Sequence, residues 1–334
     1  MNNPATFSAY VVTKSANGQV AAAVSQVPLQ DLPPGKVLVR VAYSSLNYKD
    51  ALAATGHPGV TKKFPHIPGI DAAGEVVESA DARFTPGQLV IVTGHELGGG
   101  CWGGYAEFIR VPAEWVVPLP QGLSLRESMI LGTAGFTAAQ CVDGLVGNGI
   151  SPDRGEIVVT GASGGVGSWA IAILAKLGFQ VAAVSGKPSA HDYLKNLGAT
   201  RILSREQVDD PSGQPLLKGQ WSGAVDTVGG TILVTLVRSL QQRGCVTACG
   251  MTAGTDLPLT VFPFILRGVR LVGIDSAWCP ADKRLEIWHR LATDWKSDHF
   301  DQIAQKTIGL SQLGDSVRDI LAGQICGRIV VKLR

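Results

Sequence analysis

The stretch EIVVTGASGGVGSWAIAILAKLG at residues 156–178 decides the fold of half of this chain. The apolar run from Glu156 to Thr160 predicts a buried strand, and the apolar residues after the glycines predict a helix that starts near Gly165. Gly161 lets the chain turn sharply, and Gly164 has no side chain to keep a phosphate away from the backbone. A helix N-terminus presents unpaired N–H groups and a partial positive charge, so this turn suits a pyrophosphate.

A second strand, expected at Gln180 to Ser185, completes a strand–helix–strand unit of about 30 residues. An ordinary glycine turn is the alternative, since glycines also mark turns without a ligand. Strand, turn, helix and second strand occur together here, which favours a dinucleotide-binding site. The residues that we expect to line the phosphates are Ser163, Gly164, Gly165, Val166 and Gly167.

The end of the second strand indicates which dinucleotide binds. An NAD site usually carries Asp or Glu there to hold the ribose 2′-hydroxyl, whereas this chain has Ser185, Gly186 and Lys187. A carboxylate would repel a 2′-phosphate, but a hydroxyl and an ammonium would bind one. Arg205 ends the expected third strand, Arg201 to Arg205, on the same rim. Each cation alone could be a solvated surface charge; together, with no acid at this position, they favour NADPH.

Length and composition are those of a two-domain globular protein. A chain of 334 residues exceeds what one compact core usually accommodates. A net charge of +2, with 17% charged residues and no basic block, indicates neither a nucleic acid nor an anionic membrane as a partner. The six cysteines form no paired framework, the N-terminus lacks a signal-peptide pattern, and no apolar run looks long enough to span a bilayer. We therefore expect a cytoplasmic enzyme.

Two patterns divide the chain near residue 124. Before it, short strands separated by Pro and Gly turns predict an antiparallel, partly closed β-barrel. After it, apolar strands alternate with helices, which predicts an α/β domain with a doubly wound parallel sheet covered on both faces. We expect the end of the chain to return to the first domain. The expected domains are residues 1–124 with 306–334, and residues 125–305.

Six segments carry a resemblance to known proteins: PGIDAAGEVV (68–77), GTAGFTA (132–138), ASGGVG (162–167), SSLNYKD (44–50), VVTGASGGVG (158–167) and FILRGVRLVGIDS (264–276). The first three resemble the medium-chain dehydrogenase/reductase superfamily. The last three resemble its zinc-free, NADPH-dependent acrylyl-CoA reductases, which are often grouped with quinone oxidoreductases. The resemblance covers the whole chain and implies a GroES-like catalytic barrel and a Rossmann domain.

The same comparison predicts no catalytic zinc. Zinc members of the superfamily carry a cysteine where this chain has Asn47, and a His-Glu pair where it has Ile70 and Asp71. Asn47 and Ile70 supply neither the thiolate nor the imidazole of a tetrahedral zinc site. His95 and Glu96 are other candidate ligands, but on one strand, where we expect them, adjacent side chains point to opposite faces.

A nicotinamide enzyme without zinc can still reduce an activated carbon–carbon double bond. Hydride adds to the β-carbon, negative charge accumulates on the carbonyl oxygen, and a proton must reach the α-carbon. Tyr48 lies in the loop that lines the nicotinamide pocket in relatives, so its ring could cover the cofactor and its phenol could donate the proton. A partly buried aromatic with a satisfied hydroxyl is the alternative.

Three polar neighbours complete the predicted catalytic set. Asn47 could orient the substrate carbonyl, and Asp50 could cap a helix running from Tyr48 to Ala54. Asp71, expected on a turn before a strand, could reach the pocket floor. Capping or turn roles are equally open for both aspartates.

The resemblance implies further cofactor contacts in the second domain. Thr137 is expected near the pyrophosphate. Gly250, Met251, Ile265 and Ser276 are expected near the nicotinamide, with core packing as the alternative for Ile265.

The sequence indicates the substrate less clearly than the cofactor. A coenzyme A tail would need basic contacts for its phosphates, and the first domain offers cations that could equally be scattered solvated charges: Arg40, Lys62, Lys63, Arg83 and Arg110. The glycine-rich stretch GHELGGGC (94–101), expected to be mobile, departs from close relatives where a loop could close on an acyl group. The leading hypothesis is reduction of acryloyl-CoA to propionyl-CoA. The alternatives are a quinone or enone oxidoreductase, and an NADPH-binding protein with little turnover.

A homodimer is the expected assembly. The apolar strand predicted at Val269 to Ile274 should lie at the edge of the parallel sheet. An exposed apolar edge invites pairing with a second copy of the chain.

Overall fold

The computed structural model describes residues 4–334 and forms two compact units. Unit 1 contains the residues up to Thr133 with Ala277–Ala292 and Ala304–Arg334, and unit 2 contains Ala134–Ser276 with Thr293–Ile303.

The division differs from the expected domains mainly at Ala277–Ala292, which belongs to unit 1 rather than to the dinucleotide-binding half. Arg284 gives the physical reason. Its buried guanidinium donates through Nη1 to the carbonyl oxygen of Thr93 at 3.0 Å and through Nη2 to that of Ala277 at 3.0 Å. A buried cation needs such acceptors, and no local sequence pattern indicates where they lie.

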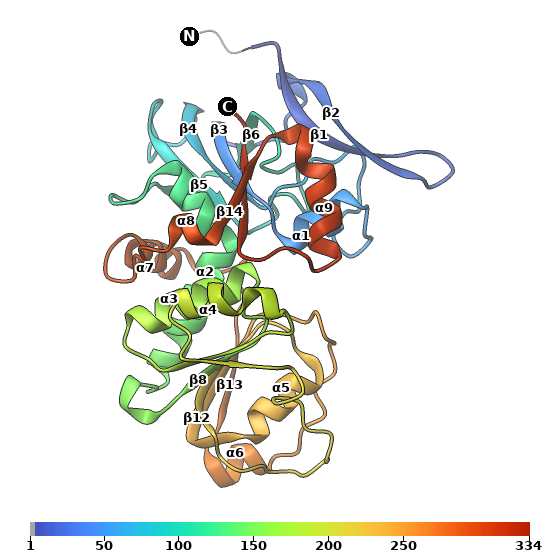
Figure 1. The fold of residues 1–334 in the computed structure, drawn as a ribbon. Helices are drawn as coiled ribbons and strands as arrows, with labels where there is room; N and C mark the ends of the chain where they lie inside the picture. The colour runs from blue at the N-terminus through green and yellow to red at the C-terminus, as the bar shows by residue number, and fades with distance from the viewer. Residues whose placement is uncertain (1–3) are drawn as a thin grey trace. The chain divides into compact units, whose positions relative to one another are not determined.

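Unit 1 is built on a mainly antiparallel sheet with the strand order β14-β15-β3-β4-β5-β7, and β6 pairs with β3 (Figure 1). A separate antiparallel hairpin is formed by β1 and β2. The elements of this unit are β1 (Thr6–Lys14), β2 (Val20–Pro28), β3 (Val37–Ser45), α1 (Tyr48–Ala54), β4 (Asp71–Ser79), β5 (Leu89–Thr93), β6 (Phe108–Val111), β7 (Val116–Pro118), α7 (Ala281–Ala292), β14 (Ala304–Ile308), α9 (Leu313–Leu321) and β15 (Arg328–Lys332). Because β15 pairs antiparallel with β3, the end of the chain returns to the first domain as predicted.

Successive side chains of β3 point to opposite faces of the sheet, and their contacts show how each face is covered. Val37, Val39 and Val41 join one buried cluster, whereas Leu38 joins another on the opposite face. Both faces of the strand are therefore buried, as a barrel requires. The strand β2 carries little apolar signal in the sequence, because its alanine-rich run is mostly exposed.

Unit 2 is built on a parallel sheet with the strand order β10-β9-β8-β11-β12-β13 (Figure 1). Its elements are β8 (Ile157–Val159), α3 (Gly165–Lys176), β9 (Val181–Val184), α4 (His191–Asn196), β10 (Arg201–Leu203), β11 (Trp221–Asp226), α5 (Gly230–Arg238), β12 (Leu240–Ala248), α6 (Phe262–Arg267), β13 (Arg270–Gly273) and α8 (Phe300–Ile303). With β8 counted as the first strand of the unit, this is the 3-2-1-4-5-6 order of doubly wound folds, in which ligands bind at the carboxyl ends of the strands where the order reverses. That reversal lies between β8 and β11, and β13 is an edge strand as predicted.

The helix α2 (Leu125–Gly147) begins in unit 1 and continues in unit 2, with non-helical dihedral angles at Gly132 (φ 49°, ψ −157°). By length and hydropathy it is the one helix within residues 4–334 that could cross a membrane, so the expectation that no apolar run would be long enough is wrong. About 72% of its most apolar window is buried inside the protein. That burial is typical of a core helix.

Candidate active site and cofactor site

The glycine-rich turn in unit 2 has the geometry that its sequence predicts. α3 begins at Gly165, with Gly164 as its N-cap residue. Gly161 has a positive φ of 55°, and a Cβ there would lie 2.1 Å from the hydroxyl oxygen of Thr227. A Cβ at Gly167 would lie 2.5 Å from the carbonyl oxygen of Gly161. Both positions therefore require glycine, and the turn brings the start of α3 close to the end of β8.

A buried carboxylate, which the sequence analysis did not identify, joins the ends of β8 and β11. Asp226 accepts hydrogen bonds from the hydroxyl of Thr160 at 2.7 Å and from the N–H of Gly229 at 2.8 Å. The N–H of Thr227 donates in turn to the Thr160 hydroxyl at 2.9 Å. Burial raises the pKa of Asp226. This network holds the two strand ends together where the strand order reverses.

The residues predicted to bind a 2′-phosphate lie together beyond β9 and β10. The Lys187 N–H donates to the hydroxyl of Ser185 at 3.2 Å. A Cβ built on Gly186 would lie 3.2 Å from Nε and 3.4 Å from Cζ of Arg205, so the guanidinium lies against this glycine. The structure therefore brings a hydroxyl and two cationic residues to one place, a donor set that fits a phosphate.

The remaining predicted cofactor residues fall into two groups. Thr137 and Ser163 are buried, and Gly250 follows the carboxyl end of β12, where a Cβ would lie 2.0 Å from the carbonyl oxygen of Thr227. Met251, Ile265 and Ser276 are not core residues. Met251 and Ile265 are 70% and 69% exposed, which excludes simple core packing for Ile265, and Ser276 is half-buried.

Asp71 is the centre of a buried polar network in unit 1. It is the first residue of β4, not part of a turn, and it is fully buried. Its carboxylate accepts the hydroxyl of Ser45 at 2.5 Å, the amide of Asn47 at 2.8 Å and the hydroxyl of Thr133 at 2.6 Å. Nη2 of Arg328 lies 3.7 Å away and donates to the Ser45 hydroxyl at 2.6 Å.

The break in α2 at Gly132 leaves room for the buried network around Asp71. A Cβ on Gly132 would lie 2.5 Å from Oδ2 of Asp71 and 2.9 Å from Nη2 of Arg328. The positive φ of this glycine also turns the N–H of Thr133 toward Asp71, which accepts it at 3.0 Å. A side chain at this position would displace the buried ion pair.

Asn47 and Asp50 fix the start of α1. Asp50 accepts the N–H of Asn47 at 2.8 Å and that of Ile70 at 2.8 Å, which confirms its predicted capping role. Burial, followed by the charge of Asp71, raises the pKa of Asp50 to about 7. The Asn47 amide donates to Asp71 and accepts from Nη1 of Arg328 at 3.0 Å.

These contacts bear on the predicted catalytic roles. The Asn47 amide has partners at both ends, and both aspartates are fully buried. These contacts favour positioning of the loop for all three residues, and contact with a substrate stays a prediction. Tyr48, the first residue of α1, is 46% exposed, and its hydroxyl has no hydrogen-bond partner within residues 4–334. The side chain is thus partly buried, as the alternative had it, but within residues 4–334 its hydroxyl is not satisfied.

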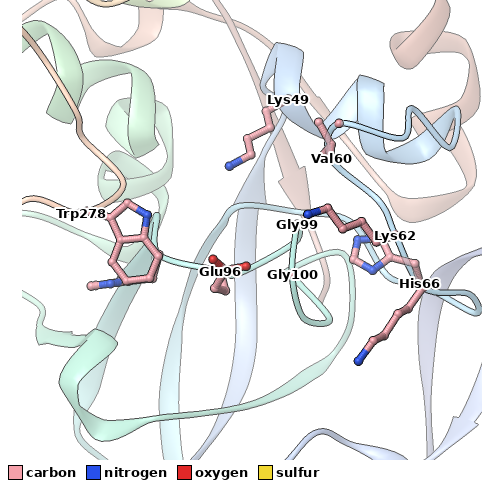
Figure 2. Close-up of a pocket in the computed structure, with 11 residues that line it drawn as sticks. Lys49, Val60, Lys62, His66, Glu96, Gly99, Gly100 and Trp278 are labelled. Carbon is pink, nitrogen blue, oxygen red and sulfur yellow. The ribbon is translucent and has the colours of Figure 1, made fainter.

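A pocket of about 310 Å³ opens in unit 1 beside α1 (Figure 2). Its lining includes Lys49, Lys62, Lys63, His66, His95, Glu96 and Trp278. His95 and Glu96 lie beyond the end of β5 and not on a strand, since His95 has a positive φ of 53°. The His95 ring stacks on Trp115 with centroids 5.3 Å apart, and burial, followed by the charge of Arg284, lowers its pKa to about 4.

The stretch 94–101, expected to be mobile, packs tightly against the segment before β4. The carbonyl oxygen of Gly98 lies 3.0 Å from Nε2 of His66. A Cβ on Gly98 would lie 2.5 Å from the carbonyl carbon of Gly69. The glycines of this loop therefore allow close backbone contact.

Comparison with known proteins agrees with this geometry. Residues 33–121 match the alcohol dehydrogenase GroES-like domain, and residues 165–284 match the zinc-binding dehydrogenase family. An acrylyl-CoA reductase from Ruegeria pomeroyi is 47% identical over 326 residues, which covers 97% of this chain and 98% of the relative. The chloroplast envelope quinone oxidoreductase homolog of Arabidopsis thaliana is 34% identical, over 92% of each protein.

Two solved structures are similar over nearly the whole chain. The yhdH oxidoreductase from Salmonella enterica in complex with NADP has a TM-score of 0.95 and 49% identity, covering 98% of this chain and 100% of that one. The Bacillus subtilis protein yhfP with NAD bound has a TM-score of 0.96 and 47% identity, covering 99% and 100%.

A GroES-like barrel combined with a Rossmann sheet defines the medium-chain dehydrogenase/reductases, and this chain belongs to that superfamily. Within it, the chain belongs to the branch that contains acrylyl-CoA reductases and quinone oxidoreductases. One matching family is described as zinc-binding. No group of three or more His, Cys, Asp or Glu side chains in residues 4–334 is arranged to hold a metal ion.

Proposed function

We propose that this protein is an NADPH-dependent reductase that converts acryloyl-CoA to propionyl-CoA. The observation that carries the proposal is the exposed phenol of Tyr48 beside a buried positioning network, in a chain 47% identical to an acrylyl-CoA reductase. A quinone or enone oxidoreductase is the second candidate, because a 34% identical relative is named as a quinone oxidoreductase homolog.

The residues of unit 2 support NADPH as the cofactor. The turn from Gly161 to Gly167 leaves backbone N–H groups at the start of α3 for a pyrophosphate. Lys187 and Arg205 supply cations for a 2′-phosphate. A relative at 47% identity carries NAD in its solved structure, and one at 49% carries NADP. Selectivity in this chain therefore depends on the residues beyond β9 and β10.

The chain's own residues have separate roles in the proposed reaction. NADPH, when bound, supplies a hydride, which adds to the β-carbon of the acyl group while one proton adds to the α-carbon, leaving NADP⁺ and propionyl-CoA. Tyr48 donates a hydrogen bond or proton from its exposed phenol. The network around Asp71 and Asp50 holds the first turn of α1, so that the phenol is presented in one position.

The direct test is NADPH oxidation, followed by absorbance at 340 nm, with acryloyl-CoA and with a small quinone, each repeated with NADH. We expect kcat/KM for acryloyl-CoA of about 10⁴ M⁻¹s⁻¹ or more with NADPH, and a much lower value for the quinone. The reverse order would assign the quinone oxidoreductase function. Stoichiometric NADPH binding without oxidation of either acceptor would indicate a binding protein with little turnover.

A further inference from the structure

The pocket beside α1 is unusually rich in unpaired positive charge. Lys49, Lys62 and Lys63 line it, and within residues 4–334 none of them forms an ion pair. Among the described residues that line it, Glu96 is the only acidic one. Figure 2 shows that Lys49 and Lys62 extend toward the space bordered by Glu96 and Trp278.

The other cations considered for the substrate are already neutralised. Arg40 lies 3.5 Å from Glu75, and Arg110 lies 3.9 Å from Glu78. Arg83 contacts Asp81 at 2.9 Å. The structure therefore separates the lysines of the pocket from the paired arginines of the barrel surface, a distinction that the sequence did not show.

We infer that this pocket binds the phosphorylated nucleotide end of the coenzyme A thioester. The inference rests on the proposed function and names the residues that would make the enzyme select a coenzyme A ester. Ammonium groups bind phosphate oxygens by charge-assisted hydrogen bonds, and a coenzyme A tail carries three phosphate groups. Lys49, which lines the pocket, directly follows Tyr48 in the first turn of α1, so the pocket and the phenol assigned to the reaction share one helical turn.

Trp278 supplies an aromatic surface for the adenine ring. Its side chain is 58% exposed, and its ring meets His95 edge-on with centroids 5.8 Å apart. His95 is itself stacked on Trp115. Aromatic side chains bind bases by stacking, because every base presents a π-face. The indole thus contacts His95, remains more than half exposed and lines the same pocket as the lysines.

The test compares acryloyl-CoA with acryloyl-N-acetylcysteamine, which keeps the thioester but lacks the nucleotide. In the Lys62→Ala/Lys63→Ala double variant we expect KM for acryloyl-CoA to rise at least tenfold, with kcat within threefold of wild type. KM for the truncated thioester should not change. Lys332→Ala, an exposed lysine of β15 outside the pocket, should alter neither substrate. An equal change for both substrates, or no change for either, would overturn the inference.

A binding measurement separates failure of this inference from failure of the proposed function. Adenosine 3′,5′-bisphosphate is titrated calorimetrically into the full-length protein saturated with NADP⁺, so that the dinucleotide site is filled. We expect binding that weakens with salt, is lost in the double lysine variant, and is weakened in Trp278→Ala but restored in Trp278→Phe. Such binding without turnover of acryloyl-CoA would reject the proposed reaction and keep the pocket assignment. Absence of binding to wild type would overturn the pocket assignment.

Discussion

The carboxylate of Asp71 and the guanidinium of Arg328 lie 3.7 Å apart at the centre of unit 1, and both side chains are almost completely buried. The first residue of β4 is thereby joined to the first residue of β15. Arg328 also donates to the carbonyl oxygens of Leu46 and Ile130, at 3.0 and 3.2 Å. The pair therefore joins β4 and β15 to the residue after β3 and to α2.

Arg328→Ala should destabilise the protein strongly, because it leaves Asp71 as a buried charge without its cation. Breaking a buried pair in this way costs about 3–5 kcal/mol. The matched control is Arg318→Ala, which removes an exposed ion pair with Asp315 and should leave the unfolding midpoint nearly unchanged. Thermal unfolding followed by circular dichroism measures both. Similar midpoints for the two variants would contradict a structural role for the buried pair.

Asp50 should make stability depend on pH. Its pKa in the folded protein is about 7, well above the ordinary carboxyl value of about 4. Between these two values the folded state holds a proton that the unfolded state has lost, so stability should fall as pH rises through this window. Asp50→Asn cannot titrate there. Its unfolding midpoint should therefore decline less between pH 5 and pH 8, and parallel curves would show that Asp50 ionises normally.

Removal of the cations beyond β9 and β10 should weaken NADPH selectively. We expect Lys187→Ala and Arg205→Ala each to raise the dissociation constant of NADPH about tenfold or more, since each removes a charge-assisted contact to the 2′-phosphate. The constant for NADH should stay the same. Lys195→Ala, an exposed lysine of α4, serves as the control. Equal weakening of both cofactors would contradict a contact with the 2′-phosphate.

Tyr48→Phe tests the proposed proton donor. The ring remains but the hydroxyl is lost, so kcat with acryloyl-CoA should fall by the factor of about 10²–10⁴ that a general acid contributes. The dissociation constant of NADPH, measured by fluorescence titration, should change little. A loss in kcat of less than about threefold would assign proton delivery to another donor and leave Tyr48 with a covering role.

Two copies of the chain should associate at the edge of the parallel sheet to form a homodimer. The helix α6 precedes the edge strand β13. The helix and its N-cap residue expose an apolar group: Val261 (64%), Phe262 (43%), Ile265 (69%) and Leu266 (56%). Light scattering after size exclusion should give twice the chain mass of 35.0 kDa. Ile265→Glu/Leu266→Glu should yield monomers, whereas Leu285→Glu, an exposed leucine of α7, should not. A wild-type mass of one chain would exclude this assembly.

Local sequence was sufficient for the strand–helix–strand unit of the dinucleotide site. The predicted strand from Glu156 to Thr160 contains β8, and α3 begins at Gly165 as predicted. The local sequence was sufficient because each of these glycines is required by a close contact within the turn or with the adjacent strand. The capping of α1 by Asp50 was predictable for the same reason, since a capping box spans only four residues.

The roles of Asn47 and Asp71 were beyond local reasoning. Their partners Thr133 and Arg328 lie far along the chain, and the antiparallel pairing of β15 with β3 places Arg328 beside Ser45. Strand register depends on the packing of the whole barrel. A polar residue near a predicted active site could therefore be a substrate contact or part of a buried support, and only the fold reveals the support.

Sequence alone was thus enough for the class of fold, the glycine turn and the residues suited to a 2′-phosphate, because periodicity, turn geometry and side-chain chemistry act over a few neighbouring residues. The tertiary structure decided which charges are paired and which are available. It buried Asp71 with Arg328, paired Arg40 with Glu75, and left Lys62 in a pocket without an ion pair to any residue in 4–334. The physical reason is that pairing and desolvation depend on distances between segments remote in the chain, which only the folded barrel sets.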